Sequence, residues 1–423
     1  MMAISPHDSR WNQIAITVAG FVGFMGYTLV MPFLPLYFRE LGVRDVGDIA
    51  LWSGLSLGIT PAMTAIGAPL WGRLSDRFGR KIMVEKSMVA FIIVMVGTAY
   101  ATSPWQILAL RMAQGVVGGY GGLFITMAAD SVPRERMMAA IGTTQSAQRL
   151  GPAIGPLVGG VLAQIVGLRY TFLVAGAFYF FAFILVKILY VEPPIAKTQP
   201  DKDGRGIGIR EVLKLENLFL LLLVVFSVQF VDRTLGPILP LYIGQLGIHA
   251  DKVPLIAGVV FSVIAVSQAI GSFCTSLTVR VSSRTVIEVG LVMALLPLLI
   301  LAITKDVVWM FVATVLFGLS IGLLMTRVYS VAGRIFPFSL RGTGFSVMTS
   351  SLLAGGAISP IFSGLLASNS IQLVFLFDAL MLLGLAVIVR YTLPRVSRVR
   401  DDLSTTSFGS RRFNVSIEDK FRE

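Results

Sequence analysis

The sequence predicts an all-α integral membrane protein with twelve transmembrane helices in two six-helix halves that are related by pseudo-symmetry. Its composition is the first observation: 55% of the 423 residues are hydrophobic and 14% are charged, and the mean hydropathy is +0.81. A water-soluble fold could not cover so much apolar surface with so few charges. The other two observations are twelve apolar stretches along the chain and two short phrases that occur twice.

The apolar stretches have the length that a membrane requires. A helix needs about 20 apolar residues to cross the hydrocarbon core, and each stretch has roughly that length or more. We place them roughly at residues 13–38, 52–72, 82–102, 105–129, 137–163, 170–190, 217–243, 254–278, 285–304, 308–331, 343–366 and 370–393.

The repeated phrases divide the chain into two related halves. "PFLPLYFRELGV" begins at Pro32 and "PILPLYIGQLGI" at Pro237, 205 positions later, at the ends of the first and seventh stretches. "GPAIGPLVGGVLA" from Gly151 recurs as "GGAISPIFSGLLA" from Gly355, 204 positions later, in the fifth and eleventh. Two repeated segments that are separated by nearly the same number of residues indicate a duplicated unit. The predicted organisation is a first half (1–190), a polar linker (191–216), a second half (217–393) and a polar tail (394–423).

The basic charge sets the topology of the chain. The net charge is +12, and only five of the 35 Lys and Arg residues fall in segments predicted to lie outside. Cytoplasmic loops of membrane proteins carry an excess of Lys and Arg, so both termini are expected in the cytoplasm. This distribution disfavours a nucleic-acid partner. The first stretch is too long for the apolar part of a cleaved signal peptide, so we expect it to remain.

The loop after the second stretch, "GRLSDRFGRKIM" from Gly72, carries a dense motif. Its second glycine permits a tight turn, its basic residues hold the loop in the cytoplasm, and its acid is expected to pair with a cation. An acid at the inner end of the fourth stretch is a further candidate partner for these cations. A loop that only sets topology is the competing interpretation. The residues concerned are Gly72, Asp76, Arg77, Gly79, Arg80, Lys81 and Asp130.

The fifth stretch carries a regular series of glycines. Gly151, Gly155 and Gly159 recur every four residues, which places them on one face of a helix. A neighbouring helix can then approach closely, as small residues allow in membranes. General helix packing would also explain any three glycines. The complete motif adds Gly142, Pro156 and Gly160.

These motifs resemble those of a known family. The loop matches the signature loop of the major facilitator superfamily, and the glycine series is similar to the antiporter motif of drug:proton exporters. "RMAQG" from Arg111 resembles the Arg-x-x-Gln-Gly motif of the same superfamily. The resemblance implies alternating access about a site between the halves, a loop that locks the cytoplasmic side, and proton transfer by Arg111. A long Arg side chain near the outer edge could instead reach the interface.

A proton-coupled transporter needs a group that can bind a proton inside the membrane. The first stretch has no acid between Trp11 and Phe38, although many relatives place one there. Asp232 in the seventh stretch is the best remaining candidate for proton coupling, with Gln229 one turn before it. Arg233 is its neighbour, so a local ion pair is the competing explanation.

Two polar residues of the fifth stretch and two tyrosines are candidates to line the substrate cavity. Arg149 lies deep in the stretch with Gln145 one turn earlier, and an Arg at such a depth should face a cavity. Tyr27 and Tyr120 are the aromatic candidates. Several arginines near a single carboxylate give anionic substrates equal weight with lipophilic cations. A structural Arg149, bound to backbone carbonyls, stays open.

We therefore predict a proton-coupled exporter of amphipathic small molecules, and alternatively a carrier for one organic anion or lipid-like metabolite. One cysteine and two histidines argue against a metal site and against an enzyme. The sequence lacks a phosphate-binding loop, which argues against an ATP-driven pump. No cofactor is expected, since the proton gradient supplies the energy. The expected partners are the lipid bilayer, a small-molecule substrate and protons, and we expect a monomer in the cell inner membrane.

Overall fold

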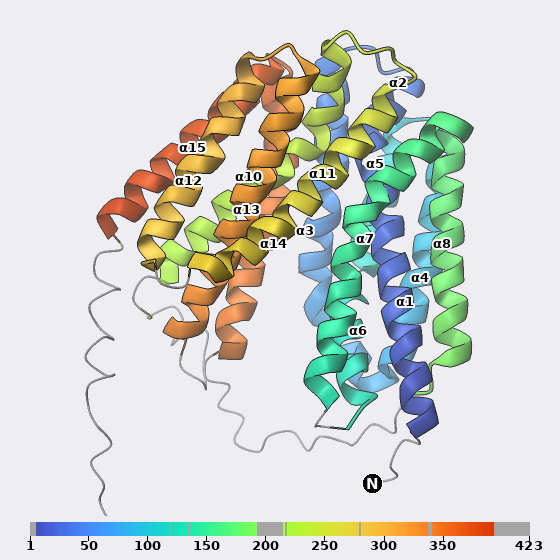
Figure 1. Cartoon of the computed structure of the whole chain (residues 1–423). Helices are drawn as coiled ribbons and strands as arrows, with labels where there is room; N and C mark the ends of the chain where they lie inside the picture. Colours follow the sequence, from blue (N-terminus) through green and yellow to red (C-terminus); the bar gives the residue numbers. More distant parts are fainter. Residues whose placement is uncertain are drawn as a thin grey trace, which may run out of the picture.

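A computed structural model describes residues 6–118, 120–133, 136–192, 215, 218–278, 281–336 and 341–392. Within these ranges the chain forms helices and connecting turns, without strands (Figure 1). Eleven helices of the described part are long and apolar enough to cross a membrane. The predicted all-α membrane fold is confirmed. The linker lies outside the described residues except for 191, 192 and 215, the tail lies outside them altogether, and the domain boundaries stay a prediction.

Six spans make up each half. In the first half they are α1 (Pro6–Val30) with η1 (Met31–Phe33) and α2 (Leu34–Glu40), α3 (Val46–Phe78), α4 (Arg80–Ala99), α5 (Pro104–Val117) with α6 (Tyr120–Asp130), α7 (Met137–Val166) and α8 (Leu168–Leu189). In the second half they are α10 (Leu218–Gln245), α11 (Val253–Cys274) with η3 (Thr275–Thr278), α12 (Ser283–Ile303), α13 (Val307–Ile335), α14 (Arg341–Ala367) and α15 (Ile371–Thr392).

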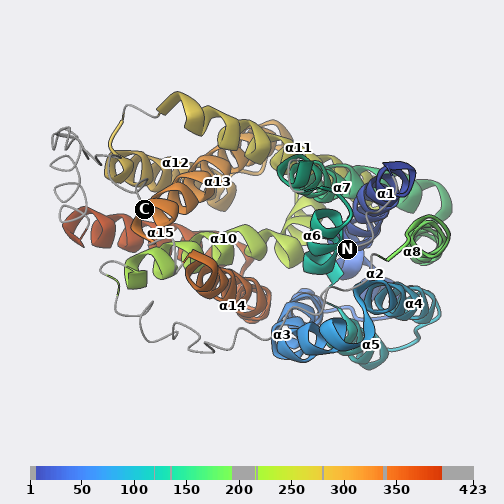
Figure 2. The same cartoon turned by 90° about the horizontal axis from the view of Figure 1, so that it is seen from below.

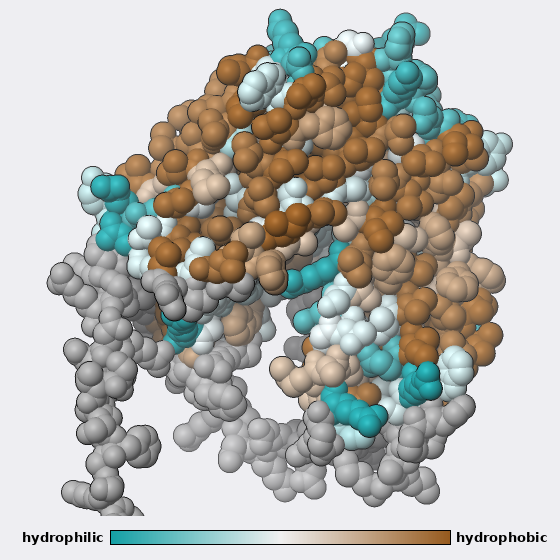
Figure 3. Space-filling model, in the orientation of Figure 1, coloured by the Kyte–Doolittle hydropathy of each residue, from teal (hydrophilic) through white to brown (hydrophobic). Residues whose placement is uncertain are grey.

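The two halves stand side by side, and the polar side chains collect at their ends. The space-filling view shows hydrophobic side chains across the middle of both halves and hydrophilic ones at the upper and lower ends (Figure 3). A hollow between the halves opens toward the lower end in that view. We call the end at which α1 begins the lower face and the end that carries α2 the upper face (Figure 1). A hydrophobic middle between polar ends is the surface that a bilayer covers.

The first repeated phrase has the same structural role in both halves. The Tyr37 hydroxyl donates a hydrogen bond of 2.8 Å to the carbonyl of Thr98, at the end of α4. The Tyr242 hydroxyl donates one of 2.8 Å to the carbonyl of Thr304, at the end of α12. Carbonyls in the last turn of a helix lack partners within the helix, so each tyrosine satisfies one of them.

The prolines of that phrase act differently in the two halves. Pro32 lies in η1, where the first span is interrupted between α1 and α2. Pro237 and Pro240 lie inside α10, which continues through them. The phrase therefore interrupts the helix in the first half only, although proline removes a backbone donor at each of these positions.

The fourth span is not the single helix that residues 105–129 predict. It is divided into α5 and α6 at Gly118, whose backbone is extended (φ −68°, ψ −168°). Five glycines between residues 115 and 122 weaken the helix here. The Trp71 indole donates a hydrogen bond to the carbonyl of Val116, and the Ser87 hydroxyl donates one of 2.9 Å to that of Val117. These donors replace the helical hydrogen bonds that the break removes.

The halves meet along two seams. Seen from below, α3 and α14 lie at one edge of the interface and α7 and α11 at the opposite edge (Figure 2). Both pairs make extensive contact. Their contacts lie toward the upper face, where glycines on one helix face the backbone of the other.

Candidate transport site

A cavity of about 370 Å³ lies between the halves, and it is lined by α1, η1, α3 and α7 of the first half and by α10, α11 and α14 of the second. Its upper side lies below the two seams. The first half supplies Tyr27, Thr28, Met31, Pro32, Leu57, Pro61, Pro152 and Pro156, and the second half supplies Gln229, Asp232, Arg233, Leu235, Gly236, Phe261, Ile264, Ala265, Gln268, Leu352, Leu353, Gly356 and Pro360. An apolar wall with a few convergent polar groups is typical of a small-molecule site.

Asp232 is the carboxylate of this cavity. Gln268 of α11 donates a hydrogen bond of 2.6 Å from its amide nitrogen to one carboxylate oxygen. The Nε atom of Arg233 lies 3.7 Å from the other oxygen. The Asp232 side chain is 18% exposed and the Arg233 side chain 57%. Asp232 is therefore an accessible acid that contacts both the Gln268 amide and the Arg233 guanidinium. This arrangement is compatible with proton coupling and with a local ion pair.

Of the predicted cavity residues, Tyr27 and Gln229 line this cavity, whereas Gln145 and Arg149 do not. The last two are exposed on α7, closer to the lower face. Arg149 lies within electrostatic range of Tyr329 on α13 of the other half. The side chain of Tyr120 lies outside what the structure describes.

Arg111 is fully buried in the first half, so it does not extend to the upper edge. One guanidinium nitrogen donates a hydrogen bond of 2.6 Å to the Gln114 side chain. Its Nε and Nη2 atoms have no hydrogen-bond partner among the described residues. Tyr27, which lines the cavity, lies within electrostatic range of Arg111. A buried guanidinium with spare donors is costly to keep, and this cost favours a functional role.

Asp378 lies outside the cavity, fully buried in α15. The Thr234 hydroxyl lies 3.4 Å from one of its oxygens and 2.9 Å from the Ser359 hydroxyl. Ser359 in turn donates to the carbonyl of Phe230 at 2.5 Å. These contacts link α10, α14 and α15 within the second half, as a structural role would require.

The turn of the lower loop is held inside the first half. Gly79, with φ +95°, separates α3 from α4. The Glu192 carboxylate accepts hydrogen bonds from the backbone N–H groups of Arg80 at 2.5 Å and Lys81 at 3.4 Å. It therefore caps the start of α4, where free N–H groups favour a negative charge. The sequence-based prediction missed Glu192, which lies 113 positions after Gly79.

The charged side chains of this loop also bind within the first half. Arg80 forms an ion pair with Asp130 at the end of α6. Lys81 donates to the carbonyls of Lys187 at 3.0 Å and Tyr190 at 2.6 Å, at the end of α8. Arg77 lies over the ring of Phe78, 5.2 Å from its centre. Gly72 and Asp76 lie in α3, and the surroundings of their side chains are outside the described part.

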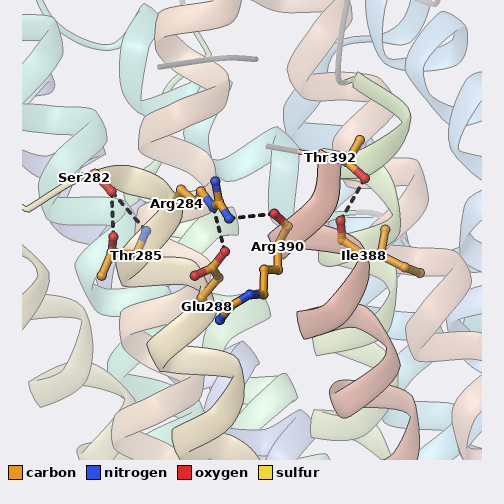
Figure 4. Close-up of polar contacts among 7 residues, drawn as sticks. All are labelled: Ser282, Arg284, Thr285, Glu288, Ile388, Arg390 and Thr392. Atoms are coloured by element: carbon orange, nitrogen blue, oxygen red, sulfur yellow. Dashed lines mark hydrogen bonds and ion pairs between the residues drawn. The ribbon is translucent and has the colours of Figure 1, made fainter. Parts of the chain in front are cut away.

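The second half holds its third and sixth spans together in a related way. Arg284, at the start of α12, donates a hydrogen bond of 2.6 Å to the carbonyl of Arg390 near the end of α15. The same guanidinium donates one of 2.7 Å to Glu288 (Figure 4). Arg284 stands 204 positions after Arg80. In both halves a basic side chain at the start of the third span, Lys81 or Arg284, therefore donates to carbonyls near the end of the sixth span, α8 or α15. In the first half Arg80 also pairs with Asp130 at the end of the fourth span.

The glycine series of α7 packs against α1. A Cβ atom on Gly151 would lie 2.7 Å from the carbonyl oxygen of Phe21, and one on Gly155 would lie 2.7 Å from that of Met25. Gly159 faces the carbonyl of Leu29 in the same way. No real Cβ fits at such distances, so the predicted close approach of a neighbouring helix occurs. Gly142 has open space around it.

The remaining two residues of the motif form the contact between the halves. Gly160 packs against Pro254 of α11, where a Cβ would lie 2.8 Å from the carbonyl oxygen, and Pro156 presents its own carbonyl to Gly258. The N–H of Leu157 donates a hydrogen bond of 3.2 Å to the Ser262 hydroxyl of α11. The α7–α11 seam therefore holds the halves together above the cavity.

Sequence comparison agrees with this architecture. The family description "Major Facilitator Superfamily" matches residues 16–326 and 254–412. The chain belongs to the major facilitator superfamily. Its all-helical fold agrees with that family, and its relatives make it a multidrug-type transporter.

Those relatives are curated bacterial proteins. The chain is 32% identical over 394 residues to "Multidrug resistance protein MdtG" of Yersinia enterocolitica, which covers 90% of this chain and 94% of that protein. It is 32% identical over 417 residues to the MdtG protein of Serratia proteamaculans, with 95% and 99% covered. It is 33% identical over 339 residues to "Multi-drug resistance efflux pump PmrA homolog" of Lactococcus lactis, with 78% and 82% covered.

Solved superfamily structures share the fold. A bacterial homolog of the human lysosomal transporter Spinster, in an inward-facing and occupied conformation, matches with a TM-score of 0.78 at 17% identity, covering 92% of this chain and 98% of that one. A nucleoside transporter, NupG, matches with a TM-score of 0.72 at 13% identity, covering 90% and 99%.

Proposed function

We propose that this protein is a proton-coupled exporter that moves amphipathic small molecules out of the cell by alternating access. The observation that carries the proposal is Asp232, an accessible carboxylate in the cavity between the halves, held by Gln268 and Arg233. The multidrug names of the relatives support the substrate class. The lower face is the cytoplasmic one in this proposal, and the membrane is the cell inner membrane.

The proposed cycle uses the charge of Asp232. When ionised, the carboxylate accepts a hydrogen bond from Gln268 of α11, and this bond stabilises the packing of α10 on α11 beneath the closed upper seams. The carboxylate also attracts Arg233, its neighbour on α10. A proton that arrives from outside neutralises the carboxylate and removes its attraction for Arg233. The competition between proton and substrate for this group couples their opposite movements.

The test is proton movement in inside-out membrane vesicles that carry an acid interior. Addition of a transported compound should release protons from the lumen in the wild type, and Asp232→Asn should abolish that release, since the amide cannot titrate. Asp232→Glu should retain part of it. Asp251→Asn, at an exposed acid of the upper face, is the matched control and should behave as wild type. An equal response of Asp232→Asn and wild type would contradict the role of Asp232.

A second function is favoured by the cations around the cavity. Arg233 is exposed in the cavity, Arg149 is exposed below it, and Arg111 lies behind Tyr27, whereas Asp232 is the acid that lines it. An excess of positive charge attracts anions, so a carrier for an organic anion or a lipid-like metabolite is the alternative. The same vesicles distinguish the two, because lipophilic cations and organic anions are added separately. A proton response to anions alone would favour the alternative.

A further inference from the structure

A cluster of buried oxygen atoms lies in the second half, where α10, α14 and α15 pack together. The Thr234 hydroxyl lies 2.9 Å from the Ser359 hydroxyl and 3.4 Å from one carboxyl oxygen of Asp378. The carbonyl oxygen of Phe230 lies 3.2 Å from the first hydroxyl and 2.5 Å from the second. The side chains of Thr234, Ser359 and Asp378 are fully buried. Two hydroxyls, a carboxyl group and a carbonyl therefore share one site inside the membrane.

The oxygen atoms of this cluster outnumber the hydrogen atoms that can satisfy them. The two hydroxyls supply one hydrogen each, and Ser359 directs its own to the carbonyl of Phe230. The second carboxyl oxygen of Asp378 has no hydrogen-bond partner among the described residues. A buried carboxyl group is costly unless a proton or a cation neutralises it. An excess of oxygen acceptors around one carboxyl group is what a hard metal cation binds.

The first half shows that the fold does not need polar groups at this place. The ring pairs Tyr37–Phe172 and Tyr242–Phe375 are equivalent in the two halves, so they set the correspondence between the spans. By this correspondence the counterparts of the three buried side chains carry no polar group. They are Leu29, Gly155 and Ala175. Apolar residues would therefore pack here, and the polar cluster of the second half indicates a role beyond packing.

The charge and the spacing of the oxygens fit a small monovalent cation. One carboxylate balances one positive charge, whereas a divalent ion would leave a net charge in the membrane interior. Ligand oxygens at right angles lie about 1.4 times the metal–oxygen distance apart, which is about 3.3 Å for a metal–oxygen distance of roughly 2.3 Å. The separations of 2.9, 3.2 and 3.4 Å in the cluster suit Na⁺ and are too short for the larger K⁺.

The cluster lies directly behind the wall of the central cavity. Gln229, Leu235 and Pro360 line the cavity, and each is the chain neighbour of a residue of the cluster. An ion can therefore arrive from the water of the cavity without crossing lipid. The carbonyl of Pro360 also faces Gly54 of α3, so the cluster lies one residue away from a contact that closes the upper face.

We propose that this oxygen cluster is a sodium site, with the Asp378 carboxylate as its charged ligand and the two hydroxyls and the Phe230 carbonyl as its neutral ligands. Bound sodium stabilises the packing of α10, α14 and α15 that supports the closed upper face. It displaces the proton that neutralises the carboxyl group in its absence, and that proton leaves through the cavity. The site is separate from Asp232, and the proposal does not depend on the proposed export function.

The first test is thermal unfolding of the full chain in detergent, with choline chloride replaced by NaCl or KCl at constant ionic strength. Sodium at ten times its dissociation constant should raise the unfolding temperature by about 3 °C, and potassium should not. Asp378→Asn should unfold as wild type in choline chloride and lose the sodium shift, and Ser359→Ala should lose the shift too. Ser363→Ala, at a buried serine one turn later in α14, is the matched control and should keep it.

Two results of this measurement would overturn the sodium site. If sodium leaves the unfolding temperature of the wild type unchanged, the Asp378 carboxyl group holds a proton and not a metal ion. If potassium acts as sodium does, or if Asp378→Asn keeps the shift, the effect is one of salt in general.

The second test measures binding of radioactive sodium to the purified protein at equilibrium. The wild type should bind sodium saturably, and Asp378→Asn should not. Asp232→Asn should bind as the wild type does, because the cavity carboxylate is no ligand of this site. Loss of binding in Asp232→Asn alone would place the ion in the cavity and refute the site at Asp378. Failure of proton release in vesicles, with sodium binding intact, would concern the export mechanism alone.

Discussion

Gly258 of α11 faces the carbonyl of Pro156 on α7, and Gly54 of α3 faces that of Pro360 on α14. Each member of one pair stands 204 positions from its counterpart in the other. Both contacts join the two halves above the cavity, and no Cβ atom fits in either. The upper closure is therefore made twice, by the same two residue types, as the duplicated sequence implies.

We predict that Gly258→Val reduces transport by about tenfold or more, because the side chain forces the α7–α11 seam apart and shifts the equilibrium away from the closed upper face. A tenfold change corresponds to about 1.4 kcal/mol, a small part of the cost of a clash with backbone. Gly244→Val, on the exposed side of α10 with open space around it, is the control. Labelling of a cysteine placed at Ser262 should become faster in the Gly258 variant. Unchanged labelling would show that the seam does not depend on this contact.

We predict that Tyr37→Phe and Tyr242→Phe each lower stability by about 1 kcal/mol. Each removes the hydroxyl that donates to helix-terminal carbonyls, those of Thr98 and Ala99 for Tyr37 and that of Thr304 for Tyr242. The two sites are far apart in different halves, so their effects should add. Thermal unfolding in detergent measures both. Tyr170→Phe, at an exposed tyrosine, should unfold as wild type. A double variant that loses no more than either single one would contradict independent roles.

Glu192→Ala should lower stability by about 1 kcal/mol, since it removes the carboxylate that caps the start of α4. Glu192→Gln should lose less, because the amide oxygen still accepts a hydrogen bond. The same unfolding measurement applies. If Glu192→Gln proved as unstable as Glu192→Ala, the charge of the carboxylate and not its hydrogen bonds would be what matters.

In sodium-free medium, Asp378→Asn should keep both stability and proton coupling, because the amide retains a polar contact with Thr234 and the site is separate from the cavity. Asp378→Leu should destabilise the second half, since it removes the polar contact of the buried Thr234 hydroxyl with Asp378. Vesicle assays and unfolding together check this. Loss of proton release in Asp378→Asn with normal folding would move the proton site from Asp232 to Asp378.

The sequence predicted what depends on pattern within one span or on the duplication. The two halves, the turn at Gly79 and the close packing of Gly151 and Gly155 all follow from residue type and spacing along one segment. Placing Asp232 in the cavity also needed only its depth in the seventh span.

Contacts between spans could not be predicted in the same way. Gln268 and Glu192 lie far along the chain from the residues they bind, and the rotation of one helix against another has no signature in a single sequence. Gln145 and Arg149 were expected in the cavity because of their depth, but they lie nearer the lower face, since depth does not say at which height two halves separate. The break at Gly118 did have a signal in its glycine cluster, and a long apolar run concealed it.

That break has a mechanical consequence. α5 packs on α3 and α4, whereas α6 packs mainly on α7 and also touches α1 and α4. Gly118 ends α5 with an extended backbone, and its N–H donates to the carbonyl of Gly115, three residues earlier, in place of the usual helical bond. The corresponding span of the second half, α13, is one uninterrupted rod of 29 residues. A force on the lower end of α6 can therefore bend the fourth span of the first half at the break, whereas the same force on the lower end of α13 moves that helix as a rigid body. The two halves should differ in stiffness.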